Sequence, residues 1–230
     1  MNFSKKQIHY ALLGNLLGDA YLRKNINTQH WVESQHTNKQ KEYVLWLEEL
    51  YLSWGLKVSS RYDFEKNTNY GTFVYSQISC KLQTNRHVEH KRLYNNKGDK
   101  IFSKYVAKRI NTFGLLLWFL DDGTLSIHTK ENGSISRHAK LSTENFSYNC
   151  HLRIQKMFFE RFNITTKIYK SKNNTFHIYF NAINFRKFYD LVRLFLKEIP
   201  KSMHYKFNMK YVVNRLESSS DNLNYNLPEQ

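Results

Sequence analysis

Residues 12–20 read LLGNLLGDA, and residues 115–123 read LLLWFLDDG. Each stretch is an apolar run that ends in an aspartate, Asp19 or Asp122, followed by a small residue. The two copies lie almost half the 230-residue chain apart, which indicates an internal repeat in which each copy belongs to one unit of the fold. As helices, both runs have apolar side chains on every face, so we expect both to be buried.

The segments after the two copies follow one order, judged from hydrophobic periodicity and turn residues. After the first copy we expect strands at 21–24 and 31–36, a helix at 39–54, strands at 57–66 and 72–78, and a helix at 85–95. After the second we expect strands at 124–128 and 135–141, a helix at 144–162, strands at 167–171 and 175–180, and a helix at 182–197. Ser142 or Thr143 is the expected cap of the helix at 144–162. The chain is therefore predicted to be α+β, with an N-terminal half at 1–107, a C-terminal half at 108–216 and a polar tail at 217–230.

Composition narrows the possible partners. Thirty-five Lys and Arg against 19 Asp and Glu give a net charge of +16, which attracts polyanions, nucleic acid first and an anionic membrane surface second. No window approaches 18 consecutive apolar residues, so we expect no membrane span. The two cysteines, Cys80 and Cys150, are too few for a disulfide framework or a four-thiolate zinc site, which favours a reducing compartment.

The repeated aspartates suggest a metal site. If a pseudo-twofold axis relates the halves and the two motif helices lie along it, Asp19 and Asp122 meet at the negative ends of both helices. Two carboxylates placed there repel each other, and a hard cation such as Mg²⁺, with Mn²⁺ as a substitute, relieves that repulsion. Beside a polyanion such a site can hydrolyse phosphodiester bonds. The alternative is two ordinary core helices with capping or solvated aspartates, which the repetition at matching positions disfavours.

The two motifs resemble the signature of the LAGLIDADG homing endonucleases, in the single-chain branch that has two copies. The resemblance covers roughly residues 8–210 and implies αββαββα halves whose antiparallel strands form a saddle on duplex DNA. It implies a staggered cut in both strands by a monomer, with Asp19 and Asp122 as the metal-binding acids. Ala20 and Gly123, the last residues of the two copies, are included among the predicted metal-binding positions.

The second copy departs from the signature where Leu116 and Leu117 replace small residues. Close packing of the two helices is therefore expected to depend on Gly14 and Gly18 alone. Asp121 matches no required role and is expected to be a local hydrogen-bond acceptor.

The family places a basic residue beside each scissile phosphate, after the last helix of each half. By that resemblance we expect Lys100 and Lys206 to assist catalysis, with Lys97, Lys104 and Lys201 as alternatives. An ammonium group there would stabilise developing negative charge or orient water. In a chain with this many basic residues, any one lysine can also be a plain phosphate contact.

Residues on or beside the predicted strands are candidates for reading the major groove, where a two-stranded ribbon fits. About half of them are expected to face away from DNA, because an error of one residue in phase moves a side chain to the other face. The candidates for base contact are Arg23, Asn25, Glu33, Gln35, Arg61, Gln77, His128, Arg137, Lys167 and His177, and those for backbone positioning are Lys24, Lys66, Lys130, Lys170 and Lys172.

The leading hypothesis is a metal-dependent, site-specific endonuclease of double-stranded DNA, linked to intron mobility. One alternative is an RNA maturase that binds its own intron RNA without cutting, and a weaker one is a transcription regulator that kept only the DNA saddle. Retention of both acids favours cleavage. A composition rich in Asn and Lys and poor in Ala suggests an AT-rich host genome, in a mitochondrion, plastid or bacterial cytoplasm.

Overall fold

The computed structural model describes residues 3–24, 30–82, 86–129, 131–171 and 173–207. The first half comprises α1 (Lys5–Leu17), β1 (Tyr21–Lys24), β2 (His30–Thr37), η1 (Asn38–Gln40), α2 (Lys41–Ser53), β3 (Val58–Thr68), β4 (Gly71–Lys81), α3 (Arg86–Leu93) and α4 (Lys104–Arg109). The second half comprises α5 (Thr112–Asp122), β5 (Gly123–Thr129), β6 (Ile135–Leu141), α6 (Tyr148–Phe162), β7 (Lys167–Lys170), β8 (Phe176–Phe180), α7 (Ala182–Val192), η2 (Arg193–Glu198) and η3 (Lys201–Lys206).

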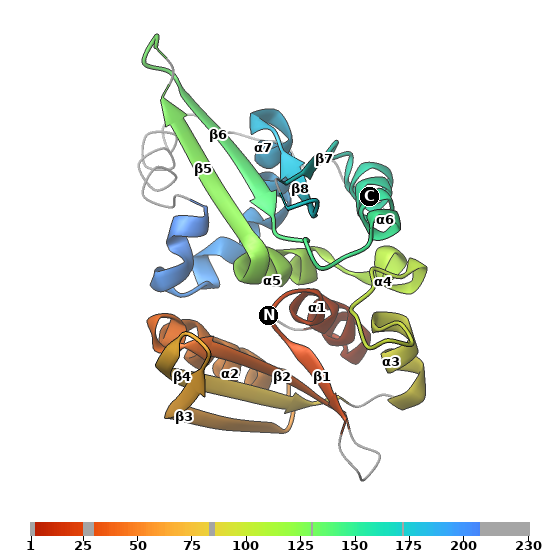
Figure 1. The fold of residues 1–230 in the computed structure, drawn as a ribbon, viewed down its shortest axis with the longest axis vertical. Helices are drawn as coiled ribbons and strands as arrows, with labels where there is room; N and C mark the ends of the chain where they lie inside the picture. Colours follow the sequence, from red (N-terminus) through yellow and green to blue (C-terminus); the bar gives the residue numbers. More distant parts are fainter. Residues whose placement is uncertain (1–2, 25–29, 83–85, 130, 172, 208–230) are drawn as a thin grey trace.

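Each half contains one four-stranded antiparallel sheet, and the two sheets have the same topology. The strand orders are β1-β2-β4-β3 and β5-β6-β8-β7. The predicted α+β fold and its internal repeat are confirmed. In Figure 1 the two sheets lie at opposite ends of the molecule, with α1 and α5 side by side between them.

Local sequence explains where the two central helices begin. Ser4 accepts from the backbone N–H of Gln7 and the Gln7 side chain accepts from the backbone of Ser4, which is a capping box at the start of α1. The Asn111 side chain accepts from the N–H of Gly114 and caps α5. Both helices are almost wholly buried along their motif residues, as their apolar faces predict.

Several predicted elements differ from the observed ones. The helix α4 was not predicted, and the proposed boundary between residues 107 and 108 falls inside it, so the domain division stays a prediction. The helix expected at 144–162 begins only at Tyr148, because the Thr143 hydroxyl bonds His151 Nε2 instead of capping a helix. The helix expected at 182–197 ends at Val192 and continues as the 3₁₀ segment η2. The proposed tail at 217–230 lies outside the described residues.

The two central helices touch through their backbones. A Cβ added at Gly14 would lie 1.8 Å from the carbonyl oxygen of Gly114, and one added at Gly114 would lie 2.8 Å from the carbonyl oxygen of Tyr10. The expectation that only Gly14 and Gly18 allow close packing was therefore wrong, because Gly114, one residue before the second motif, supplies the matching gap.

One continuous apolar core joins the halves, and Trp118, Tyr43, Tyr51, Phe102 and Phe113 are among its largest fully buried side chains. Cys80 and Cys150 are both buried and unpaired, as two small core residues. Within the part of the chain that the structure describes, no helix is both long and apolar enough to cross a membrane.

Replacing Gly14 with Ala should destabilise the protein by about 1–3 kcal/mol or more, because a methyl group must displace the backbone of α5. Helix propensity alone predicts the opposite sign, a gain of about 1 kcal/mol. Urea unfolding measures the difference. A Gly14→Ala variant as stable as the wild type would contradict the close helix contact.

Candidate active site

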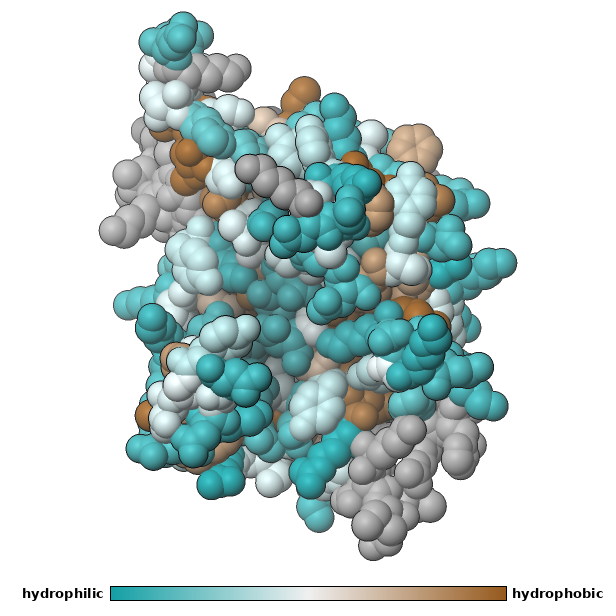
Figure 2. Space-filling view, viewed as in Figure 1, coloured by the Kyte–Doolittle hydropathy of each residue, from teal (hydrophilic) through white to brown (hydrophobic). Residues whose placement is uncertain are grey.

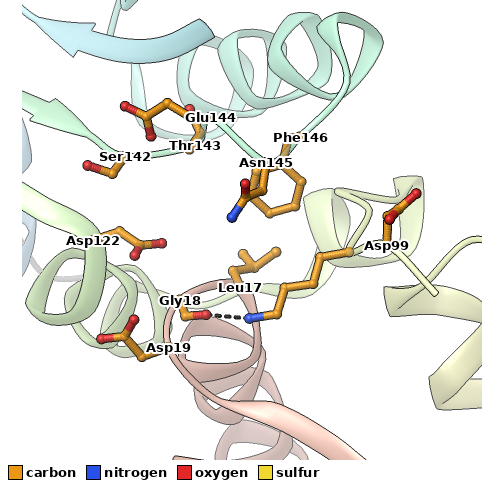
Figure 3. A pocket seen from close by; sticks show the side chains of 11 residues that line it. Leu17, Gly18, Asp19, Asp99, Asp122, Ser142, Thr143, Glu144, Asn145 and Phe146 are labelled. Carbon is orange, nitrogen blue, oxygen red and sulfur yellow. Dashed lines mark hydrogen bonds between the residues drawn. The ribbon is translucent and has the colours of Figure 1, made fainter. Parts of the chain in front are cut away.

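The C-terminal ends of α1 and α5 open into one cavity of about 450 Å³. Asp19 lies two residues beyond α1, and Asp122 is the last residue of α5. Both line the cavity, together with Lys100 and residues 142–146 of the β6–α6 connection, which lie across from Leu17 and Gly18 (Figure 3). Hydrophilic residues cover most of the face of the molecule seen in Figure 2. The predicted approach of the two motif aspartates is thus observed.

Asp122 is the more enclosed of the two motif acids. Trp118, one turn earlier on α5, donates from Nε1 to Asp122 Oδ2 at 3.1 Å. Burial and the nearby Asp19 carboxylate raise the pKa of Asp122 from 3.8 to about 7, against the opposing effect of Lys100. Because its charged form is disfavoured, a carboxyl group in this position tends to bind either a proton or a metal cation.

Asp19 is more open, with 44% of its side chain exposed, and it faces a histidine. His36 Nδ1 lies 3.7 Å from Asp19 Oδ2 and also contacts Gln40 Oε1 at 3.1 Å, while its Nε2 pairs with the Ser34 hydroxyl. Burial lowers the pKa of His36, so the neutral imidazole is favoured. The sequence offered no signal for His36, a single histidine at the end of a strand.

Asp121 joins the two halves instead of making a local contact. Its buried carboxyl group accepts from the Tyr43 hydroxyl at 2.8 Å, the backbone N–H of Asp19 at 3.2 Å and Asn15 Nδ2 at 3.5 Å, all in the first half. Burial and the neighbouring Asp19 and Asp122 raise its pKa well above the ordinary value. Asp121 takes the place that Gly18 has in the first motif, and the two residues face each other across the helix pair. The difference between the two motif copies at this position, Gly18 in one and Asp121 in the other, is the sequence feature that could have indicated the role of Asp121.

Two lysines cap the ends of the motif helices in the same way. Lys100 Nζ donates to the carbonyl oxygens of Gly18, drawn as a dashed line in Figure 3, and of Ala20 at 2.8 Å. Lys206 Nζ donates to the carbonyl oxygens of Asp121 at 3.0 Å and Gly123 at 2.9 Å. Burial lowers the pKa of both lysines, against the opposing effect of the motif carboxylates. Both therefore lie beside the acidic centre, and their catalytic roles remain a prediction.

The donor atoms at this centre suit a hard divalent cation. Asp19, His36 and Asp121 each place a possible ligand atom within 4.8 Å of the others, and Asp122 lines the same cavity as Asp19. The carboxyl groups of Asp19, Asp121 and Asp122 repel one another when they are charged, and carbonyl oxygens lie beside them. Mg²⁺ and Mn²⁺ prefer oxygen ligands of these kinds. The carbonyls of Ala20 and Gly123 already accept from lysines, but each oxygen has a second lone pair, so both stay candidate ligands.

The strand register divides the predicted DNA contacts between two faces. In the first sheet, Gln35, Gln77 and Arg61 pair across neighbouring strands on the side away from the core residues Val32 and Cys80. Arg23 and Glu33 share that open side, where the Glu33 carboxylate already binds Tyr21, Arg23 and Ser79. Lys66 also lies near Gln35, at 3.5 Å from its Oε1.

In the second sheet, His128, Lys167 and His177 lie on the open side. Arg137 and Lys170 lie on the other face of this sheet, on the same side as the buried Ala139 and Ile178. They are therefore among the candidates that face away from the proposed DNA-binding side. Asn25, Lys130 and Lys172 lie outside the described residues, as does the side chain of Lys24.

Comparison with known proteins gives one family match. The model of the LAGLIDADG DNA endonuclease family matches residues 9–188, which include both motif stretches and both sheets.

Curated relatives are distant. A cytochrome b mRNA maturase bI2 of Debaryomyces hansenii is 24% identical over 189 residues, covering 74% of this chain and 64% of the relative. A RecA protein of Mycolicibacterium flavescens is 24% identical over 203 residues, covering 85% of this chain and 45% of the relative. The chain thus spans about half to two thirds of the length of these relatives.

Solved structures agree in fold. The homing endonuclease I-WcaI, bound to its DNA recognition sequence, has a TM-score of 0.66 at 21% identity, covering 90% of this chain and 87% of the other. The LAGLIDADG meganuclease I-AabMI, bound to uncleaved DNA, has a TM-score of 0.50 at 10% identity, covering 91% of each chain.

In metal-free buffer, the raised pKa of Asp122 should make the protein less stable as pH rises. The folded state holds this proton more tightly than the unfolded chain, so the stabilisation is complete below about pH 4 and is lost as pH rises through about 7. Within that window the free energy of unfolding should fall by up to about 1.4 kcal/mol per pH unit relative to Asp122→Asn. Urea unfolding of both proteins across pH measures this difference, and parallel curves would show that Asp122 titrates normally.

Proposed function

This chain belongs to the LAGLIDADG DNA endonuclease family, and we propose that it is a site-specific endonuclease that cuts both strands of duplex DNA. One observation supports this above all: Asp19 and Asp122 line one cavity at the ends of two closely packed helices, each end capped by a lysine. The protein acts as a monomer, because one chain contains both copies of the motif.

Asp19 and Asp122 would hold a divalent cation, Mg²⁺ or Mn²⁺, with the carbonyl oxygens of Ala20 and Gly123 as further candidate ligands. When bound, such an ion lowers the pKa of a water molecule and stabilises negative charge on a phosphate. Trp118 orients the Asp122 carboxylate through its hydrogen bond, and His36 and Asp121 restrict the Asp19 segment from two sides.

Lys100 and Lys206 would each serve one strand. Each ammonium group is held by two carbonyl oxygens and can donate a third hydrogen bond into the site. A fixed positive charge beside a scissile phosphate stabilises the charge that develops in the transition state. Because the two halves repeat the same arrangement, one lysine would lie near each of two scissile phosphates.

The open faces of the two sheets would bind the duplex. In this proposal Arg23, Gln35, Arg61 and Gln77 from the first sheet and His128, Lys167 and His177 from the second meet base edges, and Lys66 positions the backbone. The match of I-WcaI, whose structure contains its DNA recognition sequence, supports this use of the sheets.

A maturase function, with the chain's own intron RNA as partner, is the second candidate. The cytochrome b mRNA maturase among the relatives favours it. Both motif acids are present and line one cavity at the helix ends, which favours DNA cleavage as an activity in either case.

Asp19→Asn and Asp122→Asn should each abolish double-strand cleavage and leave duplex binding within about a few-fold of wild type. Each acid holds metal in this proposal and contacts no base. Cleavage of a cognate duplex recovered by selection from a randomised library tests the first half of this statement, and a gel-shift titration tests the second. Either variant cutting both strands at the wild-type rate would refute the assignment.

Binding should weaken steeply with salt, because the net charge of +16 implies release of counterions from several phosphates. For roughly 6–10 phosphate contacts, affinity should fall by roughly 10³–10⁵ between about 50 and 200 mM salt. Fluorescence anisotropy with the cognate duplex in Ca²⁺ buffer gives the slope. A flat salt dependence would exclude the basic sheet faces as the DNA-binding surface.

A further inference from the structure

The segment that ends in Lys206 is held by the opposite half. The 3₁₀ segment η3 begins at Lys201, and the backbone N–H groups of Lys201 and Ser202 donate to the two carboxylate oxygens of Glu42 at 3.2 and 3.1 Å. Glu42 is the second residue of α2, in the first half. Hydrogen bonds to Ser202 lower the pKa of Glu42, so the carboxylate is charged near neutral pH. One turn and a half after this contact, Lys206 reaches the carbonyls at the end of α5.

The segment that follows Lys100 is held in the reciprocal way. Arg153 of α6, in the second half, donates from Nη1 to the carbonyl oxygen of Phe102, a fully buried residue two positions after Lys100. Arg161, two turns further along α6, donates to the carbonyl oxygen of Ala107 at 2.6 Å. The helices α2 and α6 occupy the same place in the two halves, after the second strand of each sheet.

We infer that Glu42 and Arg153 are positioning residues for cleavage: Glu42 of the first half fixes Lys206, and Arg153 of the second half fixes Lys100. The inference rests on the proposed catalytic roles of the two lysines. The two contacts involve groups of opposite charge. The Glu42 carboxylate accepts from backbone N–H groups that precede Lys206, and the Arg153 guanidinium donates to a backbone carbonyl that follows Lys100. Each half then controls cutting by the lysine of the other half, so that of these two positioning residues only Glu42 affects the strand cut by Lys206.

Strand-resolved kinetics test this inference on the full-length protein. A cognate duplex with a different fluorophore on each strand is cut in Mg²⁺ under single-turnover conditions, at saturating protein. Lys206→Met should slow one strand and Lys100→Met the other. Glu42→Ala should slow the Lys206 strand by roughly 10-fold, the value of a charge-assisted hydrogen bond, and Arg153→Met should do the same to the Lys100 strand.

Matched controls come from the same helices. Glu49→Ala removes an exposed carboxylate of α2 that has no hydrogen bond or ion pair to any described residue, and Lys156→Ala removes an exposed cation of α6 whose partner is Glu160 on the same helix. Both should cut both strands at the wild-type rate. Glu42→Gln, whose amide oxygen still accepts one N–H, should restore part of the lost rate. Glu42→Ala combined with Lys206→Met should be no slower than Lys206→Met.

The outcomes separate the inference from the function on which it rests. If Lys100→Met and Lys206→Met both leave two strands cut at the wild-type rate, the proposed lysine roles are wrong and the inference is wrong with them. If the lysine variants are strand-selective but Glu42→Ala slows neither strand, or both equally, only the inference is overturned. Thermal unfolding and duplex affinity of each variant identify a general loss of structure, which would slow both strands together.

Discussion

The backbone contact between α1 and α5 is the constraint on which the rest of the structure depends. Gly14 and Gly114 leave no room for a Cβ on either helix, so the helices cross at the closest distance that their backbones permit. Because both helices end on the same side, this contact brings Asp19 and Asp122 to one cavity without any direct bond between them. The apolar motif residues drive burial, and the two glycines determine how near the acids lie.

Electrostatics then give the site its chemistry. Three carboxyl groups lie together at the negative ends of two helices, which is an unfavourable arrangement. Burial first, and then the repulsion between neighbouring carboxylates, raises the pKa of Asp121 and of Asp122. Lys100 and Lys206 offset part of this repulsion, but both are engaged by carbonyl oxygens, so they leave the acids accessible to a cation. The two ends are not equivalent: Asp122 is held by Trp118, whereas Asp19 is open and faces His36.

Much of this arrangement can be predicted from the sequence, because the chain contains an internal repeat and each segment of one half can be compared with the corresponding segment of the other. The strand 135–141 was predicted to the residue, and the paired aspartates were predicted to meet. Local pattern could not predict where α6 begins, since a Thr143–His151 hydrogen bond replaces the expected cap. Local pattern also could not predict the hydrogen bond from the Asp19 backbone to Asp121, or the contacts of Glu42 with Lys201 and Ser202. These contacts join segments that are far apart in the chain.

The number of Mn²⁺ ions held by the protein–duplex complex tests the central claim most directly, and electron paramagnetic resonance of the free ion measures it. The claim is that the close helix contact makes Asp19 and Asp122 a metal-binding pair. It predicts tightly bound Mn²⁺ in the wild type, a loss of bound ions in Asp19→Asn and in Asp122→Asn, and weaker binding in Gly14→Ala, whose helices are forced apart. Unchanged Mn²⁺ binding in both aspartate variants would contradict it.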